Sequence, residues 1–393
     1  MTGILRRRAS ATIFLTILLD LIGFGMILPL LPFYAQRFHA TPLQIGVLFS
    51  SYSLAQLVFA PLLGRLSDRT GRRPVLLASI CGSAAAYLLF AAAGSFPMLL
   101  LARTLSGIAA SNYGIAQAYI ADVTAPEERS RAMGLVGAAF GSGFVLGPAL
   151  GGLLARFGTG AVPLAAAALS GLNLLIALIW LPESLPREVR GRSQAHPWLD
   201  VDGLRGLWRD VPLRGLMLLF FLVMLGFSMM EGTLALFCQE RFGFGVAETS
   251  WLFAYVGVVL VVIQGGLIGP LARRFGERRL ILGGILLMGL GLGLLAVAPE
   301  LWLLSLSLGL LALGSGLHNP STLALLSRLT RAESQGGTIG LSRSFGALAR
   351  ALGPPAGTWL FGAAGPGWPF WAAGGVMLVA WLIAWDLLRR VTV

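Results

Sequence analysis

Long apolar stretches fill most of this sequence, and short charged loops separate them. A helix needs about 20 apolar residues to cross the hydrocarbon layer of a membrane, and twelve stretches are long enough. Hydrophobic residues make up 56% of the chain and charged residues 12%, which leaves too little polar surface for a water-soluble protein of 393 residues. We therefore predict an all-α integral membrane protein with twelve transmembrane helices. The predicted spans cover residues 11–34, 43–64, 74–94, 96–118, 132–156, 160–181, 213–237, 246–270, 279–298, 300–326, 336–361 and 367–388.

The arginines predict which ends of the spans face the cytoplasm. The chain has a net charge of +12, and all 29 of its basic residues are Arg. Most lie at the N-terminus, in the loops after even-numbered spans and in the C-terminal tail, whereas the opposite loops contain Arg37, Arg156 and Arg241. Arginine-rich loops stay in the cytoplasm, so we predict a multi-pass protein of the cell (cytoplasmic) membrane with both termini cytoplasmic. Charges spread over short loops do not indicate a nucleic-acid partner.

The chain repeats itself in order. Each of three segments in the first half has a counterpart in the second half, at nearly the same separation. We therefore predict two six-helix bundles in parallel orientation, 1–181 and 213–393, with a substrate cavity between them near the middle of the membrane. The matching segments are "FYAQRF" (33–38) with "FCQERF" (237–242), "GRLSDRTGRR" (64–73) with "GPLARRFGERR" (269–279), and "LGPALGG" (146–152) with "LGPPAGT" (352–358).

The longest connection, 182–212, joins the predicted bundles. Its stretch "HPWLDVDGLRGLW" places Trp198, Val201 and Leu204 at helical intervals. This spacing predicts a short amphipathic helix on the cytoplasmic membrane surface. An irregular linker is the alternative interpretation.

The stretch "GRLSDRTGRR" resembles the loop motif G-x-L-a-D-r-x-G-r-r of the major facilitator superfamily. The fifth span resembles the motif G-x8-G-x3-G-P-x2-G-G of that family's drug-exporting antiporters. "LDLIGFGMILPLLP" (19–32) and "ARTLSG" (102–107) are similar to the first-span and fourth-span motifs of the same subgroup. The loop match consists of Gly64, Leu66, Asp68, Arg69, Gly71, Arg72 and Arg73, and the fifth-span match of Gly134, Gly143, Gly147, Pro148, Gly151 and Gly152.

One further stretch, "AYIADVTAPEERSRAMG", is similar to the corresponding part of tetracycline exporters. That resemblance implies acidic groups in spans three and nine and a His in span eight; here spans three and nine contain no acidic residue and span eight contains no His. The sequence therefore favours a drug/proton antiporter and leaves its drug open.

The charged loop between spans two and three, Arg65 to Arg73, is too short to move independently of either span. We expect Asp68 to approach an arginine or the positive N-terminal end of a neighbouring helix, and Gly64 and Gly71 to permit the close turn. The resemblance implies that the loop is a conformational latch, which Arg69, Arg72 and Arg73 complete. The alternative is that these charges only fix the topology and contact anionic lipid. The second copy of the loop has Arg273 in place of Asp68.

Asp20 is the first candidate for carrying protons, because ionisable residues inside membrane spans are costly and usually functional. It lies near the middle of the first span and shares a helical face with Thr16, Gly23 and Ile27, on which it is the only charged residue. A carboxyl group in such surroundings can take up and release a proton reversibly. The resemblance implies an acid at this position. A structural ion pair is the alternative.

Four other ionisable residues within spans are further candidates. Arg103 in span four is expected near the level of Asp20 and could pair with it, and Glu231 in span seven could bind a cation or a second proton. His318 in span ten titrates near neutral pH, and Arg350 in span eleven could neutralise Glu231 or bind an anionic substrate. Packing, fixed ion pairs or exposure at the cavity rim are the alternatives. Polar, aromatic and thioether side chains that could line an adaptable cavity are Asn112, Tyr113, Gln117, Phe227, Met230, Tyr255 and Gln264.

The predicted function is proton-coupled export of small amphipathic or drug-like molecules, which would confer antibiotic resistance. The alternative is a metabolite transporter of the same fold, such as a sugar exporter or a symporter. We find no metal-binding His–Glu helix, nucleophile constellation, phosphate loop or selectivity filter, so an enzyme or a channel is disfavoured and no cofactor or metal is expected. An ion gradient is then the expected energy source. The expected partners are the substrate, protons and lipid, and the protein is expected to be a monomer.

Overall fold

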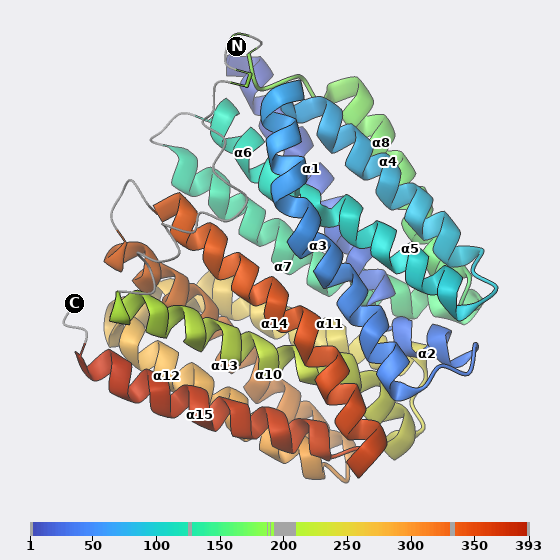
Figure 1. Cartoon of the computed structure of the whole chain (residues 1–393), viewed down its shortest axis with the longest axis vertical. Coiled ribbons are helices and arrows are strands. Elements are labelled where there is room, and N and C mark those ends of the chain that lie inside the picture. The colour runs from blue at the N-terminus through green and yellow to red at the C-terminus, as the bar shows by residue number, and fades with distance from the viewer. Residues whose placement is uncertain are drawn as a thin grey trace. The chain divides into compact units, whose positions relative to one another are not determined.

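The computed structural model describes residues 3–124, 128–186, 188, 190–191, 210–330 and 335–390, and these ranges contain helices and no strand. The all-α fold predicted from the sequence is confirmed. Apolar surroundings offer backbone groups no water, so a spanning segment must satisfy them internally, as a helix does. The helices, labelled in Figure 1, are α1 (Gly3–Ile27), α2 (Leu31–Gln36), α3 (Pro42–Thr70), α4 (Arg72–Ala91), α5 (Phe96–Ala109), η1 (Ala110–Asn112), α6 (Tyr113–Val123), α7 (Arg129–Leu154), η3 (Ala155–Phe157), α8 (Ala161–Trp180), α10 (Val211–Phe242), α11 (Val246–Val262), the π-helical segment η5 (Ile263–Leu267), α12 (Ile268–Val297), α13 (Leu301–Leu329), α14 (Gln335–Ala364) and α15 (Trp368–Arg390).

Within the described ranges, nine helical segments are long and apolar enough to cross a membrane. One of them, Val246–Val297, is 52 residues long, more than twice what one crossing needs. The predicted fourth span, 96–118, is divided among α5, η1 and α6. The count of twelve spans stays a prediction.

The chain divides into two compact units, which do not follow the halves of the sequence throughout. The predicted division into residues 1–181, 182–212 and 213–393 stays a prediction, and the predicted helix at 196–208 lies outside the described residues. The first unit contains Met1–His39, Ser51–His196 and Gly245–Ala254, and the second Ala40–Ser50, Pro197–Phe244 and Tyr255–Val393.

In the first unit, α1 packs against α7 and α8, and α4 packs against α5 and α8. The core between these helices includes Ile13, Ile80 and Tyr119. In the second unit, α10 packs against α14 and α15, and α12 packs against α13 and α15. The pairs α1–α7 and α10–α14 thus hold corresponding places in the two copies of the repeat.

Two glycines interrupt the helices where the repeat predicts charged loops. Gly71, with φ 110°, is the one residue between α3 and α4. The loop is therefore shorter than the predicted nine residues, because α3 continues to Thr70 and α4 begins at Arg72. Gly276, with φ 74°, produces a kink inside α12. Both conformations are ones that residues with a Cβ rarely adopt.

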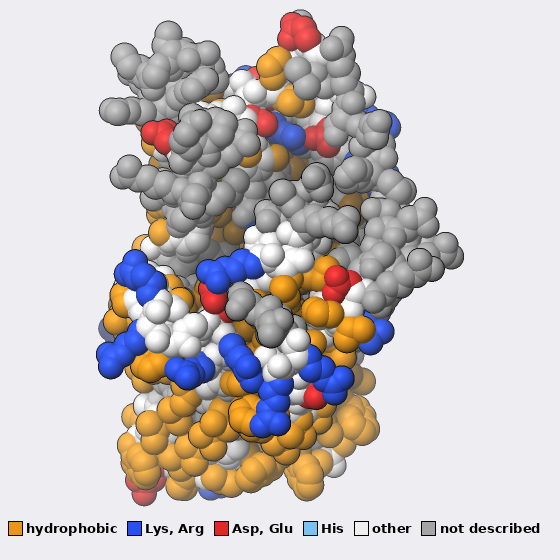
Figure 2. All heavy atoms as spheres, turned by 90° about the vertical axis from the view of Figure 1, so that its left-hand side faces the viewer, with side chains coloured by type: hydrophobic (Ala, Val, Ile, Leu, Met, Phe, Trp, Pro, Cys, Tyr) orange, Lys and Arg blue, Asp and Glu red, His pale blue; other side chains and the backbone are white. Residues whose placement is uncertain are grey.

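Figure 2 shows arginine side chains gathered in a band next to a continuous hydrophobic surface. The exposed arginines of the second unit include Arg273, Arg274, Arg389 and Arg390, at the kink of α12 and the end of α15. Charged helix ends beside apolar helix sides are typical of a membrane protein.

Candidate functional site

Asp20 lies in α1 and is held by two asparagines from other helices of its unit. Nδ2 of Asn112 donates to Oδ2 of Asp20 over 3.2 Å, and Nδ2 of Asn173 donates to Oδ1 over 3.1 Å. Both asparagines are buried, whereas Asp20 is half-buried. The structure thus brings Asp20 together with Asn112, which we had predicted only as a cavity residue.

Arg103 in α5 is buried among aromatic rings close to this acid. Its guanidinium carbon lies 4.2 Å from the ring centre of Tyr52 and 5.3 Å from that of Phe24. Phe24 follows Asp20 by one turn of α1. A guanidinium over an aromatic face is attracted by the ring quadrupole. Arg103 is therefore stabilised by aromatic faces, and its pairing with Asp20 stays a prediction.

The other ionisable candidates lie on three helices of the second unit. His318 in α13 is buried; its Nδ1 and Oγ1 of Thr322 are 3.3 Å apart, and its Nε2 has no hydrogen-bond partner within the described ranges. Glu231 in α10 and Arg350 in α14 are half-buried. Their proposed roles stay predictions.

The cavity candidates differ widely in exposure. Met230 in α10 is buried, and Tyr255 in α11 is 40% exposed. Gln264 is also exposed and lies in the π-helical segment η5, a type of helix that often marks a functional site. The half-buried candidates are Tyr113 and Gln117 in α6 and Phe227 in α10.

A cavity of about 600 Å³ occupies another part of the first unit. Arg37 lines it and donates through Nη1 to Oγ1 of Thr159 over 2.6 Å, and Tyr34 lines it beside the guanidinium. None of the cavity residues predicted from the sequence lines this cavity.

The glycines of the fifth-span motif form the surface of α7 on which α1 packs. A Cβ on Gly147 would lie 2.7 Å from the Cα of Gly25 and from the carbonyl oxygen of Ile22. A Cβ on Gly151 would lie 2.9 Å from the carbonyl oxygen of Met26. Side chains at these positions would separate the two helices, so the glycines permit a contact between backbones.

The remaining motif residues extend this contact in part. A Cβ on Gly143 would lie 2.5 Å from the Cβ of Leu21, and Pro148 is buried at the same contact. Gly152 faces the first residues of α11, which belong to the same unit. Gly134 lies in α7, and its surroundings are outside the described side chains.

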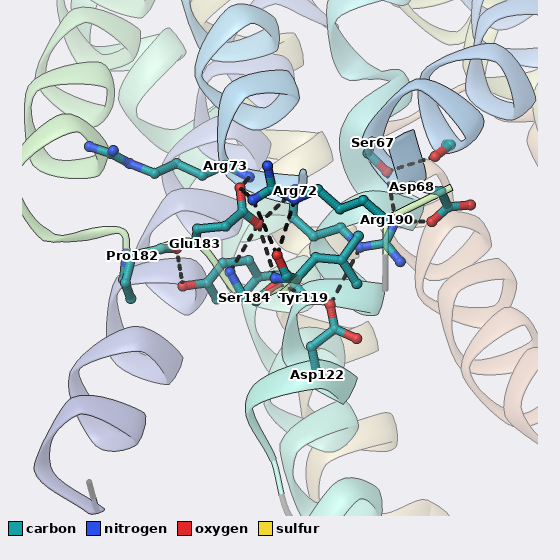
Figure 3. A network of polar contacts seen from close by, with 12 residues as sticks. Ser67, Asp68, Arg72, Arg73, Tyr119, Asp122, Pro182, Glu183, Ser184 and Arg190 are labelled. Carbon is teal, nitrogen blue, oxygen red and sulfur yellow. Dashed lines mark hydrogen bonds and ion pairs between the residues drawn. The ribbon is translucent and has the colours of Figure 1, made fainter. Parts of the chain in front are cut away.

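The charged junction between α3 and α4 is centred on Arg72 (Figure 3). Nη1 of Arg72 lies 2.5 Å from Oδ1 of Asp68, and Nε lies 3.4 Å from Oδ2 of Asp122 at the end of α6. Arg72 also donates from Nη1 to Oγ of Ser67 over 2.7 Å. Asp68 thus finds the arginine partner expected for it, and Arg72 joins three helices.

The carboxylate at the N-terminal end of α4 comes from Glu183, just after α8. Oε1 of Glu183 accepts from the backbone N–H of Arg72 over 2.9 Å, and Oε2 accepts from that of Arg73 over 3.3 Å. These N–H groups have no partner inside the helix, and the positive end of the helix dipole attracts the carboxylate. The same carboxylate lies 3.6 Å from Nη2 of Arg190, and the backbone N–H of Gly191 donates to the carbonyl oxygen of Asp68 over 3.0 Å. The chain that follows α8 is therefore fastened to the junction.

The two loop glycines have different surroundings. At Gly71 any Cβ would collide with the Glu183 carboxylate, and the positive φ adds strain. Gly64 lies within α3 with open space around it, so the close approach expected there is not present. Arg69 is exposed, and Arg73 donates from Nη2 to the carbonyl oxygen of Leu178 over 2.8 Å.

Sequence reasoning missed two important partners, Asn173 and Glu183. An asparagine in the largely apolar span 160–181 was a usable signal, since polar groups in membrane spans face other helices. Glu183 directly follows the same span. Its role depends on the tertiary fold, which brings the end of α8 beside the start of α4.

Comparison with known families decides the class of protein. A model of the Major Facilitator Superfamily matches residues 13–267 and residues 261–392. The chain belongs to the Major Facilitator Superfamily. It is therefore a multi-pass membrane protein from a family of transporters rather than of enzymes, and the resemblance seen in its motifs is confirmed.

Similar proteins match the chain almost from end to end. The tetracycline resistance protein of class G from Vibrio anguillarum is 36% identical over 395 residues, covering 98% of each chain. The class C protein from Escherichia coli is 34% identical over 380 residues, covering 95% of each chain. The crystal structure of the human organic anion transporter MFSD10 (TETRAN) is 30% identical, covers 98% of this chain and 100% of its own, and has a TM-score of 0.74.

Proposed function

We propose that this chain is a secondary active transporter that exports small amphipathic, drug-like molecules in exchange for protons. Family membership and the likeness to tetracycline resistance proteins support export of this kind. The observation that carries the proposal is an ionisable group, Asp20, inside an apolar helix of the first unit. An acid in such a place is costly and is usually retained for function.

The surroundings of Asp20 suit a proton carrier. Two amide N–H groups hold the carboxylate in place, and its partial exposure leaves a route for a proton to arrive. Alternating access would let Asp20 bind a proton from one side of the membrane and release it on the other, in competition with substrate for the cavity. Arg103 would stabilise the carboxylate form, and Glu231 and His318 are the reserve candidates.

The arrangement in the membrane follows from the charges. We place both termini in the cytoplasm and the protein in the cytoplasmic membrane, because the arginine-rich loops would then be cytoplasmic. Two six-helix bundles, 1–181 and 213–393, would move about a cavity between them, and the segment 182–212 would connect them.

The charged junction would act as the conformational latch. Arg72, Asp68 and Asp122 tie the ends of α3, α4 and α6 together. Glu183 adds the segment that leads toward the second half of the chain. A junction of this kind can stabilise one state of the cycle and weaken in another, because its bonds depend on relative helix positions.

We propose a class of substrate and not a single compound. The relatives named for tetracycline resistance and the human organic anion transporter both favour an amphipathic organic molecule. The acidic groups and the His that the tetracycline-exporter resemblance implies are missing from spans three, nine and eight. A panel should therefore contain tetracycline, a cationic dye and an organic anion.

The test uses the protein in liposomes with an imposed pH gradient. Wild type and Asp20→Asn are compared for gradient-driven movement of each panel member, with Ser170→Ala as a control for substitution of a buried polar residue. Movement that only Asp20→Asn abolishes is the expected result.

Two other results would change the proposal. Movement that Asp20→Asn leaves intact would preserve export and shift proton coupling to Glu231 or His318. No gradient-driven movement of any panel member would contradict drug export and favour a metabolite.

A further inference from the structure

The hydrogen bonds of Asp20 in this structure suit its ionised form. Nδ2 of Asn112 and Nδ2 of Asn173 meet opposite oxygens of the carboxyl group, at 3.2 and 3.1 Å. An amide NH₂ group only donates, and an ionised carboxylate only accepts. The arrangement therefore satisfies the carboxylate on both sides.

Protonation turns one oxygen of the carboxyl group from a hydrogen-bond acceptor into a donor. A carboxylic acid carries an O–H that must donate, and an O–H directed at the buried Asn173 is unfavourable unless it meets an acceptor there. Asn173 has an acceptor to offer, because its Oδ1 is buried and has no hydrogen-bond partner within the described ranges. A half-turn of the side-chain amide would exchange Nδ2 and Oδ1 and bring this acceptor to Asp20.

We propose that Asn173 is a positioning residue that responds to the protonation of Asp20. Its Nδ2 donates to the carboxylate, and after a half-turn of the amide its Oδ1 accepts from the carboxylic acid. Asn112 keeps its donor on the opposite oxygen in both states. The inference rests on the proposed role of Asp20 as proton carrier and adds the residue of α8 that keeps α1 bonded in both protonation states.

Asn173 also bonds to the backbone of α1 at Thr16. Nδ2 of Asn173 also donates to the backbone carbonyl of Thr16 over 3.2 Å, while the Thr16 hydroxyl is buried and unpaired in the described part of the chain. Thr16 lies one turn before Asp20 on α1. The half-turn of the amide breaks this hydrogen bond to the Thr16 carbonyl, so the bond that Oδ1 then accepts from the Asp20 acid has to compensate for it.

Few other ionisable groups adjoin Asp20. The packed faces of α7 from 136 to 154 and of α8 contain no ionisable residue, so Asn173 responds to Asp20 alone on that side. Arg103 faces the region from α5 over Phe24, and Tyr52 from α3 lies against Arg103. From α4, Tyr87 would lie 3.3 Å from a Cβ on Gly23. From α6, the ionisable residues are Tyr113, Tyr119 and Asp122.

The experiment is infrared difference spectroscopy of the purified protein in lipid, between neutral and acidic pH. Asp20→Asn identifies the carboxylic-acid C=O band of Asp20, and isotope-labelled asparagine identifies side-chain amide bands. Wild type should show both the acid band and a change in an asparagine amide band. In Asn173→Leu the acid band should persist at a higher frequency, because it has lost its hydrogen bond, and the amide change should vanish.

A matched control and a transport assay complete the test. Ser170→Ala removes another buried polar group of α8, one turn earlier, and should leave both bands in place. Gradient-driven transport by Asn173→Leu should fall about tenfold, the effect of one lost hydrogen bond. Asn173→Gln retains the amide and should recover part of the loss.

The outcomes separate this inference from the proposed function. An Asp20 acid band that Asn173→Leu leaves unmoved would overturn the inference and leave the proton carrier in place. An unchanged asparagine amide band in wild type would also overturn it, even if Asn173→Leu did not fold. Absence of any Asp20 acid band, with normal transport by Asp20→Asn, would remove the proposed carrier itself and the inference with it.

Discussion

Gly71 and Gly276 hold corresponding places in the two copies of the repeat, and their backbones are nearly alike. Their φ and ψ angles are 110° and 158° at Gly71, and 74° and 157° at Gly276. Their surroundings differ. A Cβ at Gly71 would collide with Glu183, whereas a Cβ at Gly276 would meet nothing within 4 Å. The turn is common to both copies, and among the described residues a carboxylate lies against the glycine in the first copy and not in the second.

The ion pairs at the two junctions have opposite polarity. In the first unit Arg72, directly after the glycine, lies 3.4 Å from Asp122, one residue before the end of α6. In the second unit Glu277, directly after the glycine, lies 2.8 Å from Arg328, one residue before the end of α13. A pair of opposite charges therefore occupies this place in both copies, with opposite orientation. Asp68 and Glu183 are additional partners at the first junction, and the second copy has Arg273 in place of Asp68.

The largest expected difference follows alanine substitution of the two glycines. Gly71→Ala combines a strained backbone, worth about 1–3 kcal/mol, with the collision at Glu183, so we expect it to lower the thermal unfolding midpoint most. Gly276→Ala has the strained backbone alone and should lower the midpoint less. Thermal unfolding of both variants in the same detergent measures the difference. Equal losses would show that the surroundings of Gly71 add nothing to its backbone requirement.

A smaller difference is expected between the two glutamates. Glu183→Ala leaves the first N–H groups of α4 without an acceptor, which costs about 1–3 kcal/mol. Glu277→Ala loses a pair with Arg328, whose side chain is 59% exposed, and should cost about 1 kcal/mol or less. Chemical denaturation of the two variants provides the comparison.

Glu183→Gln is the control for the first of these variants. It keeps an oxygen that can accept from α4 and removes the charge that faces Arg190 and the helix dipole. Its loss of stability should therefore lie between those of wild type and Glu183→Ala. A loss as large as that of Glu183→Ala would show that charge, rather than capping, holds this segment.

Much of this comparison was visible in the sequence, because it depends on local patterns. The apolar spans predicted the helices, and the match of "GRLSDRTGRR" with "GPLARRFGERR" predicted corresponding loops, in which the structure has Gly71 and Gly276 at positive φ. The fifth-span glycines were visible as a spaced motif, and in the structure Gly147 and Gly151 contact α1 backbone. Spacing along one helix is enough for such predictions.

The partners of the charged groups could not be predicted in the same way. Asn173 and Glu183 lie far along the chain from Asp20 and Arg72, and nothing in local spacing indicates which helix they will face. The same applies to Arg103, whose contacts with Tyr52 and Phe24 join three helices. The predicted nine-residue loop also failed, because polar residues at the end of an apolar span can continue a helix to its next glycine.

The most informative test of stability exchanges the charges of the first pair. Arg72→Glu should destabilise the protein by about 1 kcal/mol or more, because the introduced carboxylate would face both Asp122 and Asp68. Adding Asp122→Arg recreates the polarity of the second unit. It should recover the share of the lost stability that comes from this ion pair, which a double-mutant cycle measures. Adding Asp68→Arg then reproduces all three charges of the second copy at the first junction.

Stability and transport should separate in this triple variant. If the junction serves only to hold helix ends together, stability and gradient-driven transport should recover side by side. If asymmetry between the junctions is part of the transport cycle, the triple variant should recover its unfolding midpoint while transport stays low, because both junctions would then respond alike. We expect the second result, since Glu183 and Arg190 remain in place to hold α4 while the first copy loses the charges that distinguish it.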